Sequence, residues 1–361
     1  MTKTMILAAI SAFALYGAAD VDVFTQRART SLKQARSADS AAALTDAQDA
    51  VRQALALQPE NREPRKLEVR VLLAQHRFAE AFEKAKPLNR DMPDDVEAWG
   101  LVSDAALNLG DYAEAERTAQ WMLRLRSTNV GGLQRGARLR ELFGDDDGAR
   151  EFWQTALRLS LTDQEERAWL ATQLASLMRR MGHAGEAEAL LRQVLNVNPD
   201  YQPAEAEQAR ALVVQRKYPD AVATLEARYK KVTRPDVRFE LAGALQLAGR
   251  EAEAHAAYQE FERAALAVVN EPYNYNHELV RYYTDCAPNA TEALRIAQIE
   301  AARRHDVDTL DAYAWALYKS GNADEARKQM GRALAVGTKE AAYLSHAETI
   351  AGSRKAAAGA E

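Results

Sequence analysis

The sequence predicts an all-α protein made of about nine stacked helix–turn–helix units. Three observations support this prediction: alanines recur at a nearly constant interval, glycines precede them at a fixed distance, and the composition favours helices. The 361 residues include only 17 glycines and 10 prolines, and alanine, the strongest helix former, is abundant. A constant interval is typical of a repeat array, whereas length alone would suggest two or three globular domains.

The recurring alanines define the units. From Ala115, steps of 33 to 39 residues reach another alanine in both directions along the chain. The nine anchor alanines are Ala47, Ala81, Ala115, Ala149, Ala187, Ala221, Ala254, Ala293 and Ala326. A small side chain at this place lets the second helix of each unit approach its neighbour closely, because the distance between packed helices depends on the side chains at the contact.

The residues around the anchors repeat as well. Glycine stands five residues before the anchor in five of the nine units, at Gly110, Gly144, Gly182, Gly249 and Gly321. Glycine at this point ends the first helix, because it adopts left-handed backbone without strain. Arg216 and Pro288 replace it in two units. Apolar or small residues four and seven positions after the anchor, such as Trp153 and Ala156, continue one buried helix face.

This pattern resembles the tetratricopeptide repeat. The resemblance is carried by AWGLVSDAALNLGDYAEAERTAQWML (98–123), MRRMGHAGEAEALLRQVLNVNPD (178–200) and AYAWALYKSGNADEARKQMGRAL (312–334). It covers nearly all of residues 28–345. It implies a right-handed superhelical solenoid with a concave groove, a role in binding proteins or peptide segments, and usually no catalysis. The protein is therefore expected to be a non-enzymatic scaffold.

The start of the chain has the layout of a secretory signal. Residues 5–16 form an apolar stretch after Lys3, and Gly17 and Ala19 flank a cleavage point after Ala19. We expect residues 1–19 to be removed, leaving a periplasmic or secreted chain with no membrane span. An uncleaved inner-membrane anchor and an ordinary first helix of a cytoplasmic adaptor are the alternatives.

The solenoid is expected over residues 20–345. Its first unit has a weak first helix, broken near RSADSAAALT (36–45). Residues 309–352 resemble the closing repeats of exported bacterial proteins of this class. Residues 339–352 are expected to form a helix that covers the last apolar face, as a solenoid requires, and 346–361 contain the end of that helix and a loose tail.

Motifs for catalysis are absent from the sequence. There is no glycine-rich phosphate loop and no G-x-S-x-G elbow. HELVR (277–281) begins like the helix of a zinc protease, but Arg281 stands where the second metal-binding histidine is needed. The single cysteine, Cys286, excludes an intrachain disulfide, and a net charge of −5 does not favour nucleic acid as a partner. We therefore expect no enzyme activity, no cofactor and no metal.

The resemblance places groove-lining side chains eleven and fifteen residues before each anchor alanine. These positions hold four basic residues, Lys66, Arg70, Arg138 and Arg210, and two acidic ones, Asp104 and Asp311. Because arginine pairs bidentately with carboxylates, we predict a groove that binds an acidic segment or a C-terminal carboxylate, with Trp315 as a stacking platform. The alternatives are that the basic side chains only solvate a helix face and that Trp315 is a packing residue.

An insert at residues 270–285 breaks the period. It carries four tyrosines, Tyr273, Tyr275, Tyr282 and Tyr283, around His277. Such a cluster forms either a binding hot spot or helix packing across an enlarged joint. A less favoured alternative function, an enzyme subunit, would place its site here, with Glu271, Glu278 and Asp285 as the nearby carboxylates.

Overall fold

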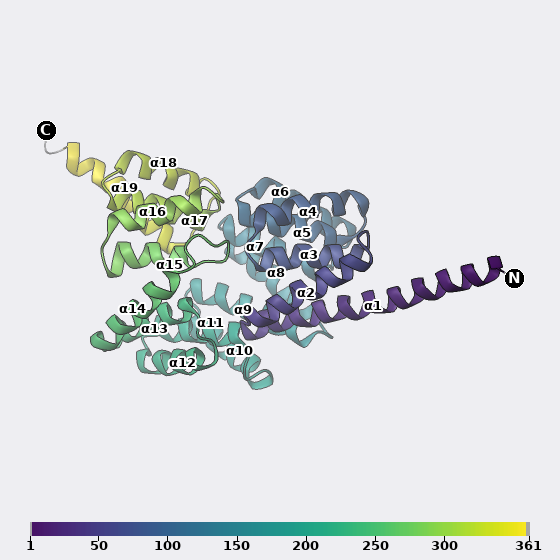
Figure 1. Ribbon diagram of the computed structural model, residues 1–361. Helices are drawn as coiled ribbons and strands as arrows, with labels where there is room; N and C mark the ends of the chain where they lie inside the picture. Colours follow the sequence, from purple (N-terminus) through teal and green to yellow (C-terminus); the bar gives the residue numbers. More distant parts are fainter. Residues whose placement is uncertain (1, 359–361) are drawn as a thin grey trace.

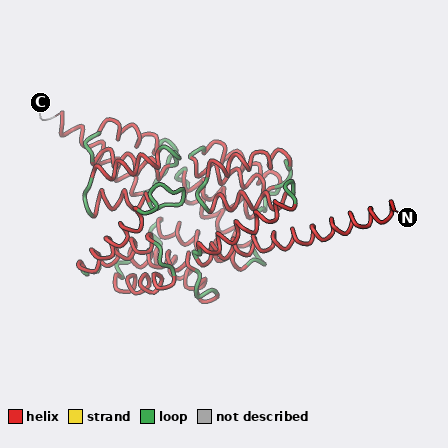
Figure 2. The backbone as a smooth tube through the Cα atoms, viewed as in Figure 1, coloured by secondary structure: helices red, strands yellow, loops and turns green. Residues whose placement is uncertain are grey.

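The computed structural model describes the backbone of residues 2–358 and the side chains of residues 20–352. Within this part, the chain forms nineteen α-helices, one π-helix and no strand (Figures 1 and 2). The helices follow one another as pairs joined by short turns, which places the two members of each pair antiparallel. The predicted all-α solenoid is therefore confirmed.

Nine helix pairs and one final helix make up the described chain. The first helices are α1 (Thr2–Ala38), α3 (Arg62–Ala74), α5 (Val96–Leu109), α7 (Val130–Leu142), α9 (Gln164–Arg180), α11 (Gln202–Val214), α13 (Pro235–Leu247), α15 (Asn276–Arg281) with η1 (Tyr282–Cys286), and α17 (Val307–Lys319). The second helices are α2 (Ala41–Leu57), α4 (Phe78–Asp91), α6 (Tyr112–Leu125), α8 (Asp146–Leu159), α10 (Ala184–Val197), α12 (Tyr218–Lys231), α14 (Glu251–Leu266), α16 (Ala290–Ala301) and α18 (Ala323–Leu334). Helix α19 (Ala341–Ala358) ends the array.

The anchor alanines lie where the sequence predicts them. All nine lie in second helices, and each is at most 2% exposed. In the third repeat, the hydroxyl of Ser103 on α5 donates a hydrogen bond to the carbonyl oxygen of Ala115 on α6 at 3.0 Å. The two backbones are this close because both contact residues are small. The interpretation of the alanine period as helix packing is confirmed.

The turns between paired helices share one backbone conformation. The five predicted glycines have φ values between 74° and 89°. Three residues other than glycine take the same left-handed conformation: Asp39 (φ 50°), His76 (φ 57°) and Arg216 (φ 60°). Arg216 therefore keeps the turn geometry without glycine, whereas Pro288 follows the π-helix of the eighth repeat.

The first repeat differs from the expectation. The helix does end within residues 36–45, at Asp39 and Ser40, but this is the turn between α1 and α2, and α1 itself runs without a break to Ala38. Ser40 caps α2 by accepting from the backbone N–H of Ala43 at 3.1 Å. Of the expected signal, residues 1–19, the backbone of 2–19 forms the outer end of α1, which extends away from the other helices in Figure 1. Residue 1 and the side chains of 2–19 lie outside the described part of the chain. Among the helices of the described residues, none is long and apolar enough to cross a membrane.

Helix α19 covers the end of the solenoid, where we expected a helix over 339–352. Ile350 is 1% exposed and packs in the cluster formed by α17 and α18. The ring of His346 stacks on Trp315 at 4.2 Å, and its Nδ1 lies 2.9 Å from a carboxylate oxygen of Asp311. The last apolar face is thereby removed from water.

The solenoid curves until its second half lies beside its first, so that α15–α19 approach α3–α8 (Figure 1). The backbone N–H of His305 donates to the carbonyl oxygen of Leu109 at 3.1 Å. The N–H of Val307 donates to the hydroxyl of Tyr112 at 2.7 Å, across 195 residues of sequence. One superhelical turn therefore takes about 195 residues.

We call this line of contact the seam. Its first side consists of the turns of the first four repeats, at Asp39, His76, Gly110 and Gly144, and its second side of the loops at Arg234, Tyr273, His305 and Gly337. The carboxylate of Asp39 pairs with Arg228 and with Arg234, and the rings of His76 and Tyr273 lie 4.7 Å apart. The seam closes the solenoid and positions the site described next.

Candidate functional site

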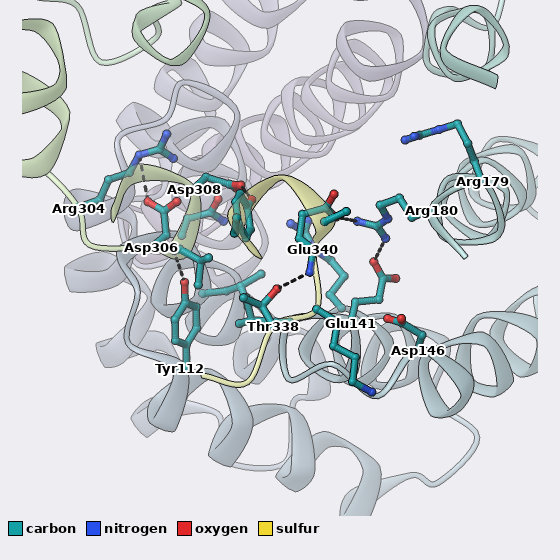
Figure 3. A pocket seen from close by; sticks show the side chains of 18 of the residues that line it. Tyr112, Glu141, Asp146, Arg179, Arg180, Arg304, Asp306, Asp308, Thr338 and Glu340 are labelled. Atoms are coloured by element: carbon teal, nitrogen blue, oxygen red, sulfur yellow. Dashed lines mark hydrogen bonds and ion pairs between the residues drawn. The ribbon is translucent and has the colours of Figure 1, made fainter. Parts of the chain in front are cut away.

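A cavity of about 580 Å³ lies between the two superhelical turns. One wall, the first wall, comes from the last turns of α5, α7, α9 and α11, together with Tyr112 and Asp146 at the starts of α6 and α8. The opposite wall, the second wall, comes from residues 304–308 and 338–343 (Figure 3). We call this space the groove cavity, because four consecutive first helices line it.

The lining residues follow the repeat phase. They stand seven or eight residues before successive anchor alanines: Leu107, Asn108, Glu141, Leu142, Arg179, Arg180 and Val214. Of the site residues predicted from sequence, Arg138 lines the cavity. The other lining positions were missed because the prediction stopped eleven residues before the anchor. Positions three and four residues further along a helix share the same face, and this is the signal that could have found them.

Several basic residues of the first helices are paired with carboxylates of a neighbouring repeat. These pairs are Arg70–Glu97, Arg135–Asp104, Arg179–Glu207 and Arg210–Glu240. Arg210 also lies 3.3 Å from Glu207. The structure therefore places two of the predicted residues, Arg70 and Arg210, in intramolecular ion pairs between repeats, which reduces the positive charge that they present to a partner.

Lys66 is buried rather than exposed in the groove. It is 5% exposed, and its Nζ lies 2.7 Å from Glu63, 2.7 Å from Glu97 and 3.1 Å from Asp95. Burial alone would lower the pKa of Lys66, but the three carboxylates outweigh it and raise that pKa. Lys66 thus holds the second and third repeats together.

Arg138 is different. Its side chain is exposed and makes no ion pair or hydrogen bond with any residue that the structure describes. The same holds for Lys339 on the second wall. Asp146 on the first wall also has no such partner, and it stands in the first turn of α8, where the helix dipole favours a carboxylate. Two unpaired cations and one unpaired carboxylate therefore face the cavity.

Arg180 connects the two walls. Its guanidinium lies between Glu141 on α7, to which it donates a hydrogen bond, and Glu340 on the second wall, 3.9 Å away (Figure 3). Partial burial would lower the pKa of Arg180, but the two carboxylates raise it by more, so the charge is retained. Arg180 is thereby positioned to bind a carboxylate on the side where Glu340 stands.

Trp315 does not form an open platform. It is 9% exposed, lies under His346 of α19, and its Nε1 donates to a carboxylate oxygen of Asp285 at 3.0 Å. The structure agrees with the packing alternative for this residue.

The aromatic insert is also mainly packing. Tyr275, Tyr282 and Tyr283 are at most 9% exposed and belong to the largest apolar cluster. The three carboxylates of the enzyme alternative share no cavity in the described structure. Glu278 lines a second cavity of about 670 Å³ with His76 and His277, and burial raises its pKa. Asp285 accepts from Trp315, while Glu271 lines a separate depression.

The comparisons with known proteins agree with the fold. A family model described as tetratrico peptide repeat matches residues 132–233. The comparison with curated proteins found no match. A chain of the APC/C hetero-tetramer Cut9-Hcn1 is similar with a TM-score of 0.53 and 13% identity, over 85% of this chain and 52% of that one. This protein thus spans about half the length of that chain.

Human IFIT1 is similar in two structures. The human IFIT1 dimer with PPP-AAAA gives a TM-score of 0.53 at 15% identity, over 82% of this chain and 80% of that one. The dimer with m7Gppp-AAAA gives a TM-score of 0.54 at 14% identity, over 82% and 78%. At such low identity these similarities establish the shared fold.

Proposed function

We propose that the chain is a tetratricopeptide repeat protein and a non-enzymatic scaffold that binds a protein or peptide segment in the groove cavity. Proteins of this repeat family are generally scaffolds for protein–protein interaction and not catalysts. The observation that carries the proposal is the alignment of four consecutive first helices along one cavity. Affinity would come from many modest contacts along a preformed concave surface.

The charges support an acidic segment as the ligand. Arg138 is unpaired, and Arg180 keeps one side toward the cavity, where Glu340 stands at 3.9 Å. Arginine forms bidentate hydrogen bonds with carboxylates, so these two residues are the ones we propose for recognition. Arg70 and Arg210 would contribute less, because Glu97 and Glu240 already neutralise them.

We further propose that the scaffold works in the bacterial cell envelope, after cleavage behind Ala19. The signal-like residues 1–19 support export. Val21, at 1% exposure, and Ala28, at 0%, are buried residues of α1 that lie after that point, so cleavage would leave both of them in the first repeat. The intact mass of the protein isolated from its native cells tests this, since a chain that retains residues 1–19 contradicts cleavage.

Affinity capture from crosslinked native cells, read by mass spectrometry, tests the binding function. The wild type is compared with Arg138→Glu and with a matched control, Arg158→Glu. Arg158 is also exposed and makes no ion pair among the described residues, but it lies on a second helix, α8, away from the cavity lining.

We expect a defined partner that is lost from Arg138→Glu and retained by Arg158→Glu. A partner retained by both variants would place binding outside the groove. Capture of nothing by the wild type would contradict the scaffold function.

A further inference from the structure

The groove cavity is bounded on one side by the protein's own second superhelical turn, while it stays partly open to solvent. Residues 304–308 and 338–343, which come from the second superhelical turn, cover the four first helices. Thr338 is 8% exposed there, and Tyr343 donates a hydrogen bond to Asp308 within the same wall. A partner segment that lay along the first helices would occupy the space of the second wall.

Glu340 holds the place of a partner carboxylate. Among the residues that the structure describes, it is the acidic side chain of the second wall that pairs with an arginine of the first wall, Arg180. The chain just before it is held close to the first wall, since a Cβ at Gly144 would overlap the carbonyl oxygen of Gly337 and lie 3.0 Å from Cγ of Lys339.

The two walls have complementary charge. The first wall contains three arginines and two carboxylates: Arg138, Arg179, Arg180, Glu141 and Asp146. The second wall contains three carboxylates and two cations: Asp306, Asp308, Glu340, Arg304 and Lys339. The second wall therefore has the charge that we propose for the ligand. On the first wall Arg179 is already paired with Glu207, so separating the walls frees Arg180 from Glu340 and leaves it beside the unpaired Arg138.

Two cavities open to solvent interrupt the seam that holds the walls together. They are the groove cavity and the cavity of about 670 Å³, and Arg304 and Asp308 line both. Between them the seam is crossed by the hydrogen bonds from His305 to Leu109 and from Val307 to Tyr112, and by Arg304 over the ring of Phe78 at 5.6 Å. Such contacts contribute modestly to stability, so opening of the seam is within reach of ligand binding.

We propose that residues 337–343 occupy the groove as an internal counterpart of an acidic partner segment, and that the partner binds when the seam opens. This inference rests on the proposed scaffold function and adds its regulation. Because only open molecules bind, the apparent affinity is the intrinsic affinity multiplied by the fraction of molecules that are open. Any change that separates Gly144 from Gly337 then increases affinity without touching the groove residues.

Glycine variants test the proposal. Gly144→Ala places a methyl group against the backbone of Gly337 and pushes the walls apart. Gly321→Ala is the matched control: its φ of 88° is equally unfavourable for alanine, but nothing lies within 4 Å of the added carbon. Glu340→Gln removes the internal carboxylate by an isosteric change and serves if Gly144→Ala fails to fold.

The probe is a fluorescein-labelled hexaglutamate peptide, followed by fluorescence anisotropy, with hexalysine as the charge-reversed control. Small-angle scattering of the free variants reports the opening independently of any ligand. We expect Gly144→Ala to bind hexaglutamate about tenfold more tightly than the wild type and to have a larger radius of gyration. We expect Glu340→Gln to bind about threefold more tightly, and Gly321→Ala to bind like the wild type.

Three results would overturn the proposal. If Gly144→Ala and Glu340→Gln bind hexaglutamate no better than the wild type, while Arg138→Glu loses binding, the groove is the site and self-closure is wrong. If hexaglutamate binds no variant, or hexalysine binds equally well, the acidic occupant is wrong, and the scaffold function is judged by the capture experiment alone. If Gly144→Ala and Gly321→Ala have the same radius of gyration as the wild type, the seam does not open.

Discussion

The turns of the third and fourth repeats and the turn of the ninth have the same backbone and different surroundings. Gly110, Gly144 and Gly321 have φ values of 85°, 74° and 88°. A Cβ at Gly110 would lie 2.5 Å from the carbonyl oxygen of His305, and one at Gly144 would overlap Gly337, whereas one at Gly321 would meet nothing. Glycine is thus needed in all three turns to end a helix, and in the first two also to let the superhelical turns meet.

Substitution of the seam glycine should have the largest effect. Gly110→Ala should lose about 2–4 kcal/mol of unfolding free energy, because left-handed strain and a backbone clash add together. Gly321→Ala should lose about 1 kcal/mol from strain alone. Urea denaturation followed by circular dichroism measures both. Equal losses would show that the seam does not contribute to stability.

Removing the charge of Asp39 should have the next largest effect. Asp39→Asn keeps a residue that tolerates left-handed backbone but leaves Arg228, which is 4% exposed, without its carboxylate. We expect a loss of about 1–3 kcal/mol in the free energy of unfolding.

The control for Asp39 is Asp147→Asn. Asp147 pairs with Arg150 on the surface of α8, and its side chain is 79% exposed. The control should lose less than about 0.5 kcal/mol in the same denaturation measurement. If Asp39→Asn loses equally little unfolding free energy, contacts other than the Asp39 ion pairs hold the seam at the first repeat.

Two turns that lack glycine separate the effect of left-handed backbone strain from the effect of contacts across the seam. Arg216 is exposed, and its side chain makes no hydrogen bond or ion pair with any described residue, so Arg216→Gly should stabilise the protein by about 0.5–1 kcal/mol. His76→Gly relieves similar strain but removes the ring contact with Phe78 and also the ring contact with Tyr273, which lies on the other side of the seam. We expect His76→Gly to stabilise the protein less than Arg216→Gly does, or to destabilise it. Equal gains in melting temperature would contradict a role of His76 in the seam.

Acid should weaken the seam slightly. Partial burial, and then Arg304 and Arg234, lower the pKa of His76 to about 4, whereas Glu300 opposes the shift and His277 adds to it. When the seam opens, this pKa returns toward its ordinary value near 6.5, so protonation favours the open state between pH 6.5 and 4. The stabilising contribution is complete above pH 6.5 and is lost as the pH falls. Because much of the His76 side chain remains in contact with solvent despite this partial burial, we expect acid to lower the stability of the seam by less than about 1 kcal/mol.

Hydrogen-exchange protection of the His305 and Val307 amides at pH 7 and pH 5 measures this effect. The control, His76→Asn, keeps a residue that tolerates left-handed backbone and removes the titration. Burial raises the pKa of Glu278, which acts in the opposite direction, but it does so in both proteins. A wild type whose protection falls no more than that of His76→Asn would exclude His76 as the responsive group.

The sequence alone located much of the fold and one residue of the cavity. The buried anchor alanines, the left-handed glycines and the capping helix could be predicted because each depends on neighbours within one or two repeats. Arg138 was found by its phase in the repeat. The phase could not reveal that Lys66 is buried under three carboxylates or that Glu240 neutralises Arg210, because those pairs depend on how successive first helices pack.

The sequence by itself determined the repeating unit, since the contacts inside a unit join residues fewer than about 40 positions apart and therefore recur with the period. The tertiary structure alone decided where the superhelical turns meet. Small rotations between successive repeats accumulate over about 195 residues, and their sum brings Gly110 to His305 and Glu340 to Arg180. No local pattern encodes that sum, and so the cover of the groove appears only in the folded chain.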